Sequence, residues 1–159
     1  MKPDTSGYTL VELLSVLAIL GLVAMLAWPR YQALADELAL QQAAAALARE
    51  LRLARQNAIT YGRECAVVFR VDSDSYLVRQ GEKSRTVKMH RGVKTAWSRF
   101  PEDPANPYDS SRSACRFLPL GTPVQGGTVH LRNQHDQSLY VVVAPVTSRV
   151  RVTAVDPGI

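Results

Sequence analysis

The chain has 159 residues, with 19 lysines and arginines against 14 acidic residues, so its length leaves room for one ordinary domain plus an appendage. Its hydrophobic residues are concentrated near the N-terminus, which excludes a chain that is uniformly soluble. The net charge of +5 is compatible with a polyanionic partner, but it is small enough to reflect only a solvated surface.

Residues 1–7 form a short polar leader, and residues 8–28 are almost entirely apolar. As a helix, these 21 residues would span roughly 31 Å, about one bilayer core. A secretory signal peptide fits poorly, because the apolar run is too long and leads directly into further helical sequence. An ordinary signal anchor remains an alternative, although it does not account for the segment from Gly7 to Glu12.

Glu12 is an acid inside this apolar segment. A carboxylate at membrane depth costs about 2.5–3.5 kcal/mol on insertion scales, and such residues are usually functional. The carboxylate therefore needs a partner that the isolated chain does not provide. The simpler alternative is a side chain that reaches the lipid headgroups.

Pro29 interrupts the apolar run, and we expect it to kink the helix rather than end it. Residues 30–61 are rich in strong helix formers, and Gly62 is a suitable residue to end the helix. Spacings of three and four predict an amphipathic helix whose apolar stripe comprises Tyr31, Leu34, Leu38, Ala45, Ala48, Leu51 and Ile59.

After Gly62 the hydrophobic pattern changes to period two. Strands are predicted at 65–71, 76–80, 85–89, 92–97, 114–121, 127–133, 138–144 and 149–155, with a loop rich in proline and aspartate before the fifth. Short strands joined by tight turns favour an antiparallel sheet. The predicted fold class is therefore α+β, with a helix packed on a β-sheet domain at 62–159.

No arrangement of residues typical of a catalytic site is present, so we predict that the protein is not an enzyme and needs no cofactor. His90, His130 and His135 have no metal-site spacing with either cysteine, so no metal site is predicted. Arg49, Arg52 and Arg55 recur at spacing three, which usually marks a solvated helix face and less often a partner site.

Arg149 and Arg151 lie two apart on the last predicted strand, so both side chains are expected on one face. There they could bind successive phosphates of DNA. The alternative is a charged, solvated strand edge that resists aggregation.

The segment Gly7-Tyr8-Thr9-Leu10-Val11-Glu12-Leu13-Leu14 resembles the cleavage and methylation motif of type IV pilins and pseudopilins. This resemblance implies that a prepilin peptidase cleaves after Gly7 and that Tyr8 becomes N-methylated. It also implies that Glu12 is the assembly acid and Pro29 the helix-kinking proline. Residues 8–29 would then be the membrane and filament-core helix.

Three later segments resemble the GspH/FimT branch of minor pilins and pseudopilins: LARELRLARQNAITYGRECAVVF, FLPLGTPVQGGTVHL and YVVVAPVTSRVRV. DNA-binding members of this branch carry Gly-Arg-x-Arg near the C-terminus. Here the tetrapeptide is Ser148-Arg149-Val150-Arg151, so both arginines are kept while the preceding turn is in question.

The resemblance implies a subunit of a type IV pilus or type II secretion filament that helps to prime assembly at the tip. Its expected partners are other pilins or pseudopilins, the prepilin peptidase and the inner membrane, with the C-terminal domain in the periplasm. The alternative is a DNA-binding minor pilin that acts in DNA uptake. Because the periplasm is oxidising and both cysteines fall in predicted strands, Cys65 and Cys115 are expected to form a disulfide.

Overall fold

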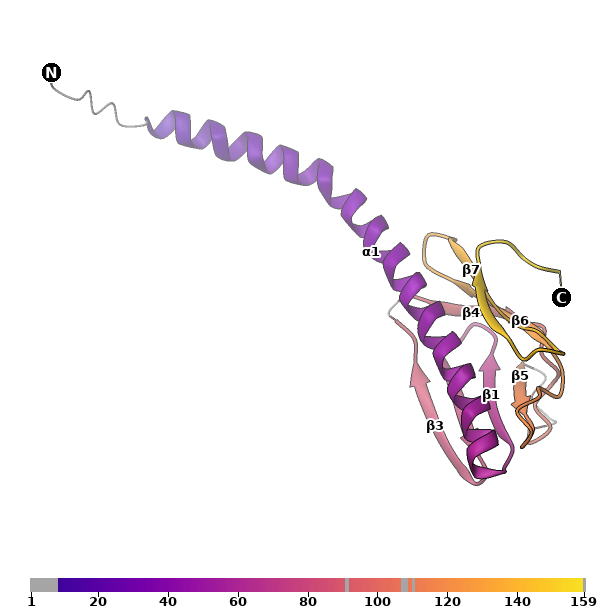
Figure 1. Ribbon diagram of the computed structural model, residues 1–159. Helices are drawn as coiled ribbons and strands as arrows, with labels where there is room; N and C mark the ends of the chain where they lie inside the picture. Colours follow the sequence, from indigo (N-terminus) through magenta and orange to yellow (C-terminus); the bar gives the residue numbers. More distant parts are fainter. Residues whose placement is uncertain (1–8, 91, 107–108, 110, 159) are drawn as a thin grey trace, which may run out of the picture. The chain divides into compact units, whose positions relative to one another are not determined.

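The computed structural model describes residues 9–90, 92–106, 109 and 111–158, in which one helix and eight strands are found. The chain divides into two compact units, 1–35 and 36–159 (Figure 1). The second unit begins within the helix, six residues after the boundary at residue 30 that the sequence indicates.

Helix α1 extends from Leu10 to Tyr61 without interruption at Pro29, so the proline does not end the helix. Proline has no backbone N–H and cannot donate to the carbonyl four residues earlier, so the helix lacks one hydrogen bond at this point. Gly62 follows the last helical residue with φ +61°, the left-handed conformation expected of a residue that ends a helix.

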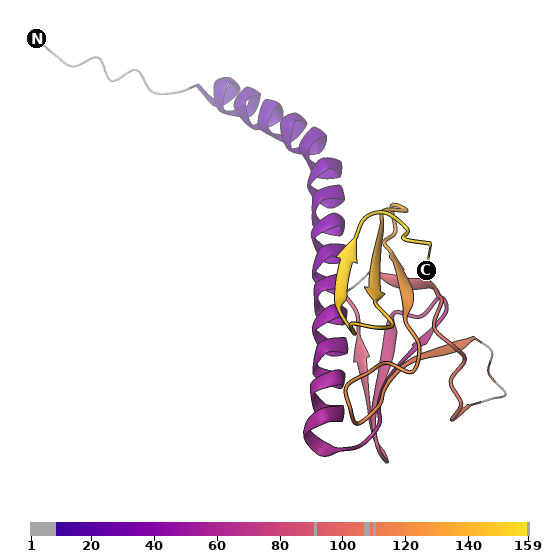
Figure 2. The ribbon, with the colours of Figure 1, turned by 45° about the vertical axis from the view of Figure 1, so that its right-hand side comes forward.

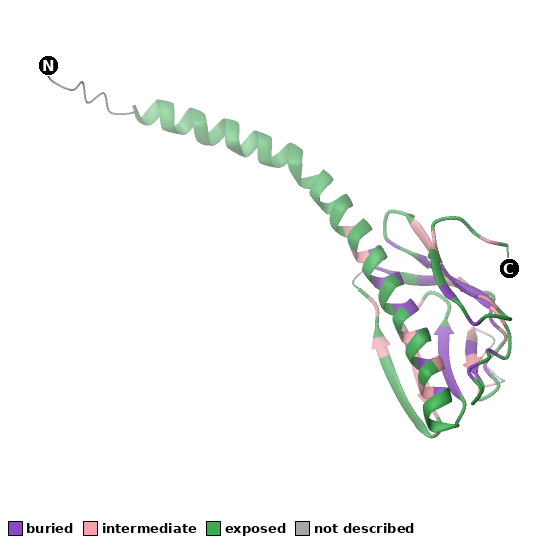
Figure 3. Ribbon diagram, viewed as in Figure 1, coloured by how far each residue is buried: buried purple, intermediate pink, exposed green. Residues whose placement is uncertain are grey.

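The described residues of the first unit, 9–35, are the apolar part of α1 with its capping residue, and their side chains are exposed throughout (Figure 3). This helix is long and apolar enough to cross a membrane by its length and composition. Within residues 9–35, no other segment covers its leucines, isoleucines and valines.

In the second unit, α1 packs against strands through a face that differs from the predicted stripe. Of the predicted stripe, Tyr31, Leu34, Leu38, Ala45 and Ile59 are exposed, and only Ala48 and Leu51 are buried. The buried face comprises Leu40, Ala43, Ala44, Leu47, Ala48, Leu51, Ala54 and Ala58. Alanines occur all round this helix, so the hydrophobic pattern gives little basis for choosing which face is buried.

The strands form two antiparallel sheets, which confirms the predicted α+β class with antiparallel strands (Figure 2). The first, in the order β3-β2-β1-β5, contains Cys65–Arg70 (β1), Ser75–Gln80 (β2), Lys83–Lys88 (β3) and Arg112–Phe117 (β5). The second, in the order β4-β6-β7-β8, contains Lys94–Ser98 (β4), Gly127–Arg132 (β6), Ser138–Val143 (β7) and Val150–Thr153 (β8). Periodicity identifies strands but not their partners, and β4 pairs with the distant β6 instead of continuing the first sheet.

One hydrophobic core joins the helix to both sheets. Its largest fully buried side chains include Phe69 and Phe117 of the first sheet, Leu47 and Leu51 of the helix, and Leu131 of the second sheet. Every buried apolar side chain of the described residues lies at or after Leu40, so the second unit has its own core.

The segment between β4 and β5 is anchored by a buried ion pair. The carboxylate of Asp103 is only 2% exposed and accepts two hydrogen bonds from Arg79 of β2, at 2.6 and 3.1 Å. Burial raises the pKa of Asp103, but the hydrogen bonds from Arg79 and from the Ala105 N–H outweigh it and hold the pKa below its ordinary value. The pair therefore fixes this long connection to the first sheet.

Candidate functional site

The described part of α1 begins with a capping arrangement at Thr9. The Thr9 hydroxyl accepts a hydrogen bond from the Glu12 N–H at 3.2 Å, and the Thr9 carbonyl accepts one from the Leu13 N–H at 3.1 Å. Threonine followed three residues later by glutamate is the pattern of a capping box. This pattern is present in the sequence and overlaps the motif that implies an assembly role for Glu12.

Glu12 is the acid in the first turn of the helix and is exposed in the isolated chain. A carboxylate at this end is favoured by the helix dipole, which offsets part of the cost of placing it in an apolar segment. Gly7 and Tyr8, the predicted cleavage and methylation residues, lie outside the described residues.

The two C-terminal arginines follow a tight turn that Ser148 completes. Ser148 adopts φ +54°, the left-handed conformation that a glycine would take without strain. Its N–H donates to the Ala144 carbonyl at 3.0 Å, and its hydroxyl donates to the Gly121 carbonyl at 3.0 Å. The turn is therefore kept despite the serine, whose buried hydroxyl gains a hydrogen bond that glycine could not make.

Gly121 connects this turn to the helix. Its carbonyl also accepts a hydrogen bond from Arg55 Nε at 3.0 Å, so helix, loop and turn meet at one backbone oxygen. A Cβ at Gly121, whose φ is +78°, would lie 2.5 Å from Ile59 Cδ1. A side chain here would have to displace the end of Ile59 and adopt a backbone conformation that glycine takes without strain.

The helix and β8 form a basic groove around this junction. Arg52 Nη2 donates to the Val150 carbonyl at 3.1 Å, which places the yellow strand β8 beside α1 (Figure 2). The groove has a volume of about 530 Å³ and is lined by Arg52, Arg55, Thr147, Ser148, Arg149, Val150 and Arg151. We call it the arginine groove.

The arginine groove brings together two segments that are far apart in the sequence, the helix at Arg52 and Arg55 and the residues from Thr147 to Arg151. Arg52 and Arg55 each use part of a five-donor guanidinium on a carbonyl, so further donors remain. Among the described residues, neither Arg149 nor Arg151 has an ion pair or side-chain hydrogen bond, and both are exposed. Arg49 is exposed but does not line the groove.

The strand assignment at these arginines differs slightly from the prediction. β8 begins at Val150, so Arg151 lies in the strand and Arg149 lies just before it. Val150 is buried in the core, and Arg151 on the opposite face pairs with Val142 of β7. Both arginines nevertheless line the same groove.

The predicted disulfide between Cys65 and Cys115 is absent from the structure, where both cysteines are free and buried. They lie on adjacent strands, but Cys65 pairs with Phe117 and Cys115 pairs with Val67, so the two thiols are diagonal neighbours. Diagonal Cβ atoms in a sheet are farther apart than the roughly 4 Å that a disulfide requires. Burial raises the pKa of both thiols, so they are poor nucleophiles.

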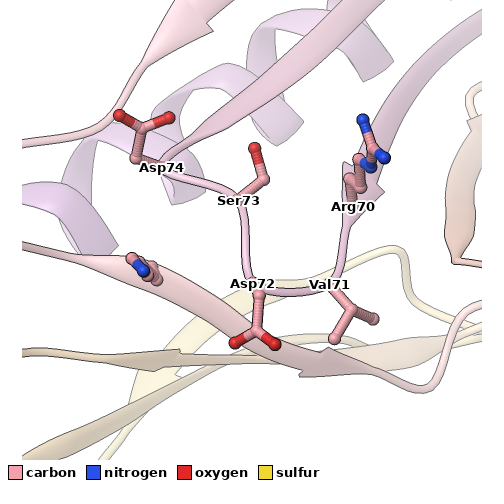
Figure 4. Close-up of a pocket in the computed structure, with 6 residues that line it drawn as sticks. Arg70, Val71, Asp72, Ser73 and Asp74 are labelled. Carbon is pink, nitrogen blue, oxygen red and sulfur yellow. The ribbon is translucent and has the colours of Figure 1, made fainter.

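The described residues contain no cluster of three or more histidine, cysteine or acidic side chains that could hold a metal ion. His135 pairs with Asp36 at 2.9 Å, and His130 contacts the Ser138 hydroxyl at 2.8 Å. The turn after β1 contains two acids, but Figure 4 shows the carboxylates of Asp72 and Asp74 pointing in different directions. Arg70 and Lys94 line the same hollow, so this turn is not built for a cation.

An apolar N-terminal helix that continues into a helix-on-sheet unit is the fold of pilin-like subunits. Residues 43–147 match the family described as Type II transport protein GspH, and residues 2–28 match the prokaryotic N-terminal methylation motif. The chain belongs to the GspH family, and with its methylation motif it is a subunit of the minor pilin and pseudopilin class.

The comparison with solved structures found two similar chains, of which the first supports the same fold. The type IV minor pilin FimU of Pseudomonas aeruginosa is 15% identical, with a TM-score of 0.54 over 74% of this chain and 90% of FimU. The minor pseudopilin EpsH from the type 2 secretion system of Vibrio cholerae is 15% identical, with a TM-score of 0.49 over 72% of this chain and 95% of EpsH. Comparison with curated protein sequences gives no significant match.

Proposed function

We propose that the chain is a minor structural subunit, without catalytic activity, that helps to prime a type IV pilus or type II secretion filament at its tip. The observation that supports this most strongly is the methylation motif on a helix whose apolar side chains remain uncovered from Leu10 to Trp28. Such a surface requires a membrane before assembly and neighbouring helices afterwards.

The proposal divides the chain into a leader at 1–7, a membrane and filament-core helix at 8–29, an amphipathic helix at 30–61 and a β-sheet domain at 62–159. Prepilin peptidase removes the leader after Gly7, and Tyr8 becomes the methylated N-terminus. The chain then spans the inner membrane once, with the sheet domain in the periplasm. Pro29 allows the helix to bend between its two halves.

Glu12 provides the assembly contact in this proposal. The free amine of Tyr8 in one subunit pairs with the Glu12 carboxylate of its neighbour in the filament. Because apolar helices slide easily past one another, this single charged pair favours one axial stagger. Before assembly, an intrachain pair between the same two groups lowers the cost of the charge in the membrane.

The subunit is expected to be present in purified filaments at a small fraction of the amount of the major subunit. Filaments isolated from the native host can be quantified by mass spectrometry with labelled standard peptides from both subunits. A deletion strain is the control, and it should assemble fewer filaments. A chain that is abundant in the membrane but absent from every filament preparation would contradict the proposal.

A second candidate function is DNA binding during uptake, which the arginine groove favours. Four guanidinium groups from α1, β8 and the preceding turn line one hollow, and none of the four has an acidic partner among the described residues. Arginine binds phosphate well because its planar fork donates two parallel hydrogen bonds. The contacts would be to the phosphate backbone and thus insensitive to sequence.

The double variant Arg149→Ala/Arg151→Ala is expected to lower the salt dependence of DNA affinity. Each neutralised phosphate contributes about 0.9 to the slope of log affinity against log salt, so the slope should fall by about two units. Titration of the full chain in uncharged detergent micelles, at several salt concentrations, measures this slope. The matched control is Lys83→Ala/Lys88→Ala, which removes the same charge from the exposed strand β3.

Stability should be unchanged in both double variants, because all four side chains are exposed. If the slope is unchanged in the arginine variant, or falls equally in the arginine and lysine variants, the binding depends on overall charge. The arginine groove would then have no specific role in DNA uptake.

A further inference from the structure

Two loops of the second unit hold apolar side chains out in solvent. Residues 118–124 lie between β5 and β6, and within them Leu120 is 86% exposed. Residues 145–147 lie between β7 and β8, and within them Val146 is 88% exposed. Among the described large apolar residues these are the two highest exposed fractions, above those of the uncovered membrane-length helix. We call residues 118–124 and 145–147 the apolar loop pair.

The apolar loop pair is held together and fastened to the helix. The Gly121 carbonyl accepts hydrogen bonds from the Ser148 hydroxyl and from Arg55 Nε, each at 3.0 Å. Ile59, one turn further along α1, lies so close to Gly121 that a Cβ there would be 2.5 Å from its Cδ1 atom. Three prolines restrict the backbone of the loop pair: Pro119, Pro123 and Pro145. A partner would therefore bind to this surface with little cost for ordering the loops.

The charges around the apolar loop pair are positive. Neither loop contains a charged residue, and Thr147 of the second loop also lines the arginine groove. None of the four arginines of that groove has an acidic partner among the described residues. An apolar surface beside such arginines complements a protein surface with an apolar centre and an acidic rim. A nucleic-acid backbone would satisfy the arginines but would leave Leu120 and Val146 in water, so the loop pair favours a protein partner.

We propose that the apolar loop pair docks a different pilin-like subunit of the same filament, through a surface of that subunit that is apolar at its centre and acidic at its rim. The inference rests on the proposed structural function and specifies the surface and the kind of partner. Docking covers Leu120 and Val146 and gives the neighbouring arginines carboxylate partners. A second copy of this chain fits less well, because a symmetric contact through this surface would bring two sets of arginines together.

The test places the photo-crosslinking residue benzoylphenylalanine at position 146 of the full chain in its native host. On irradiation we expect one major product, in which mass spectrometry identifies another protein that has its own N-terminal methylation motif. The crosslinked segment of that protein should contain acidic residues. The matched control places the same residue at position 155, where Val155 is also exposed but lies in the tail after β8. Position 155 should give about tenfold less of this product, because no apolar surface of the partner covers it.

Leu120→Glu and Leu120→Lys form a matched pair of variants that differ in the sign of the charge, and thermal melting verifies that both are folded. Crosslinking at position 146 should fall in both, and about tenfold further with Glu than with Lys, because an acidic rim repels the carboxylate. Equal losses in the two variants, a product that contains only this chain, a product that nuclease removes, or no product would overturn the inference and leave the proposed function standing. Absence of the wild-type chain from filaments would contradict the proposed function and the inference together.

Discussion

The Glu12→Ala chain is expected to insert into the inner membrane at least as well as the wild type and yet to be missing from filaments. Removing the carboxylate relieves an insertion cost of about 2.5–3.5 kcal/mol, so membrane levels should not fall. The amine of Tyr8 in the neighbouring subunit, however, loses its partner and the stagger is no longer fixed. The Thr9 hydroxyl still caps the helix, because its bond is to the backbone N–H of residue 12.

Membrane fractionation combined with crosslinking into filaments measures both effects in one strain. Glu37→Ala is the matched control, since it removes an exposed acid from the same helix but lies beyond the apolar segment. Normal incorporation of the Glu12→Ala chain would show that the carboxylate has no role in registering the helices.

Asp103→Asn is expected to give the largest loss of stability among substitutions of charged residues in the sheet domain. Asp103 is almost fully buried, and its partner Arg79 is only 23% exposed, so the variant leaves a poorly solvated guanidinium without its counter-charge. Breaking a buried pair in this way costs about 3 kcal/mol. Denaturant unfolding of the detergent-solubilised chain provides the measurement, with Asp156→Asn as the control at an exposed ion pair.

The same substitution has a signature in the pH dependence of stability. The pKa of Asp103 is lower in the folded state than its ordinary value of about 3.8. Its stabilising effect is therefore fully present above that ordinary value and is lost as the pH falls through the folded pKa. The wild type should lose stability as the pH falls below about 4, whereas Asp103→Asn should show a shallower decline. If the wild type and Asp103→Asn lose stability equally steeply as the pH falls, other carboxylates cause the loss.

Much of the fold could be predicted from local pattern. The helix end at Gly62 and all eight strands lie close to their expected positions, because period, turn residues and glycine act over a few residues. The division into two sheets could not be predicted, since it depends on β4 pairing with a strand some thirty residues further along the chain. The buried face of α1 was also missed, because alanine does not distinguish the core side from the solvent side.

Only part of the arginine groove could be predicted from the sequence. The spacing of Arg149 and Arg151 indicated a shared face. The positions of Arg52 and Arg55 depend on tertiary packing, because Arg52 binds the Val150 carbonyl and Arg55 the Gly121 carbonyl. Ser148 marked a departure from the motif in sequence, whereas its hydroxyl forms a hydrogen bond that stabilises the same turn. The thiols are free because the register of β1 and β5 places Phe117, and not Cys115, opposite Cys65. No local sequence pattern specifies that register.

The most direct test of assignment to this class of filament subunit is the intact mass of the mature chain isolated from its native host. The account predicts a mass that lacks residues 1–7 and carries one additional methyl group, with fragment ions placing that group on the amine of Tyr8. A mature chain that still begins at Met1, or one that is cut beyond Ala24 by an ordinary signal peptidase, would contradict the account.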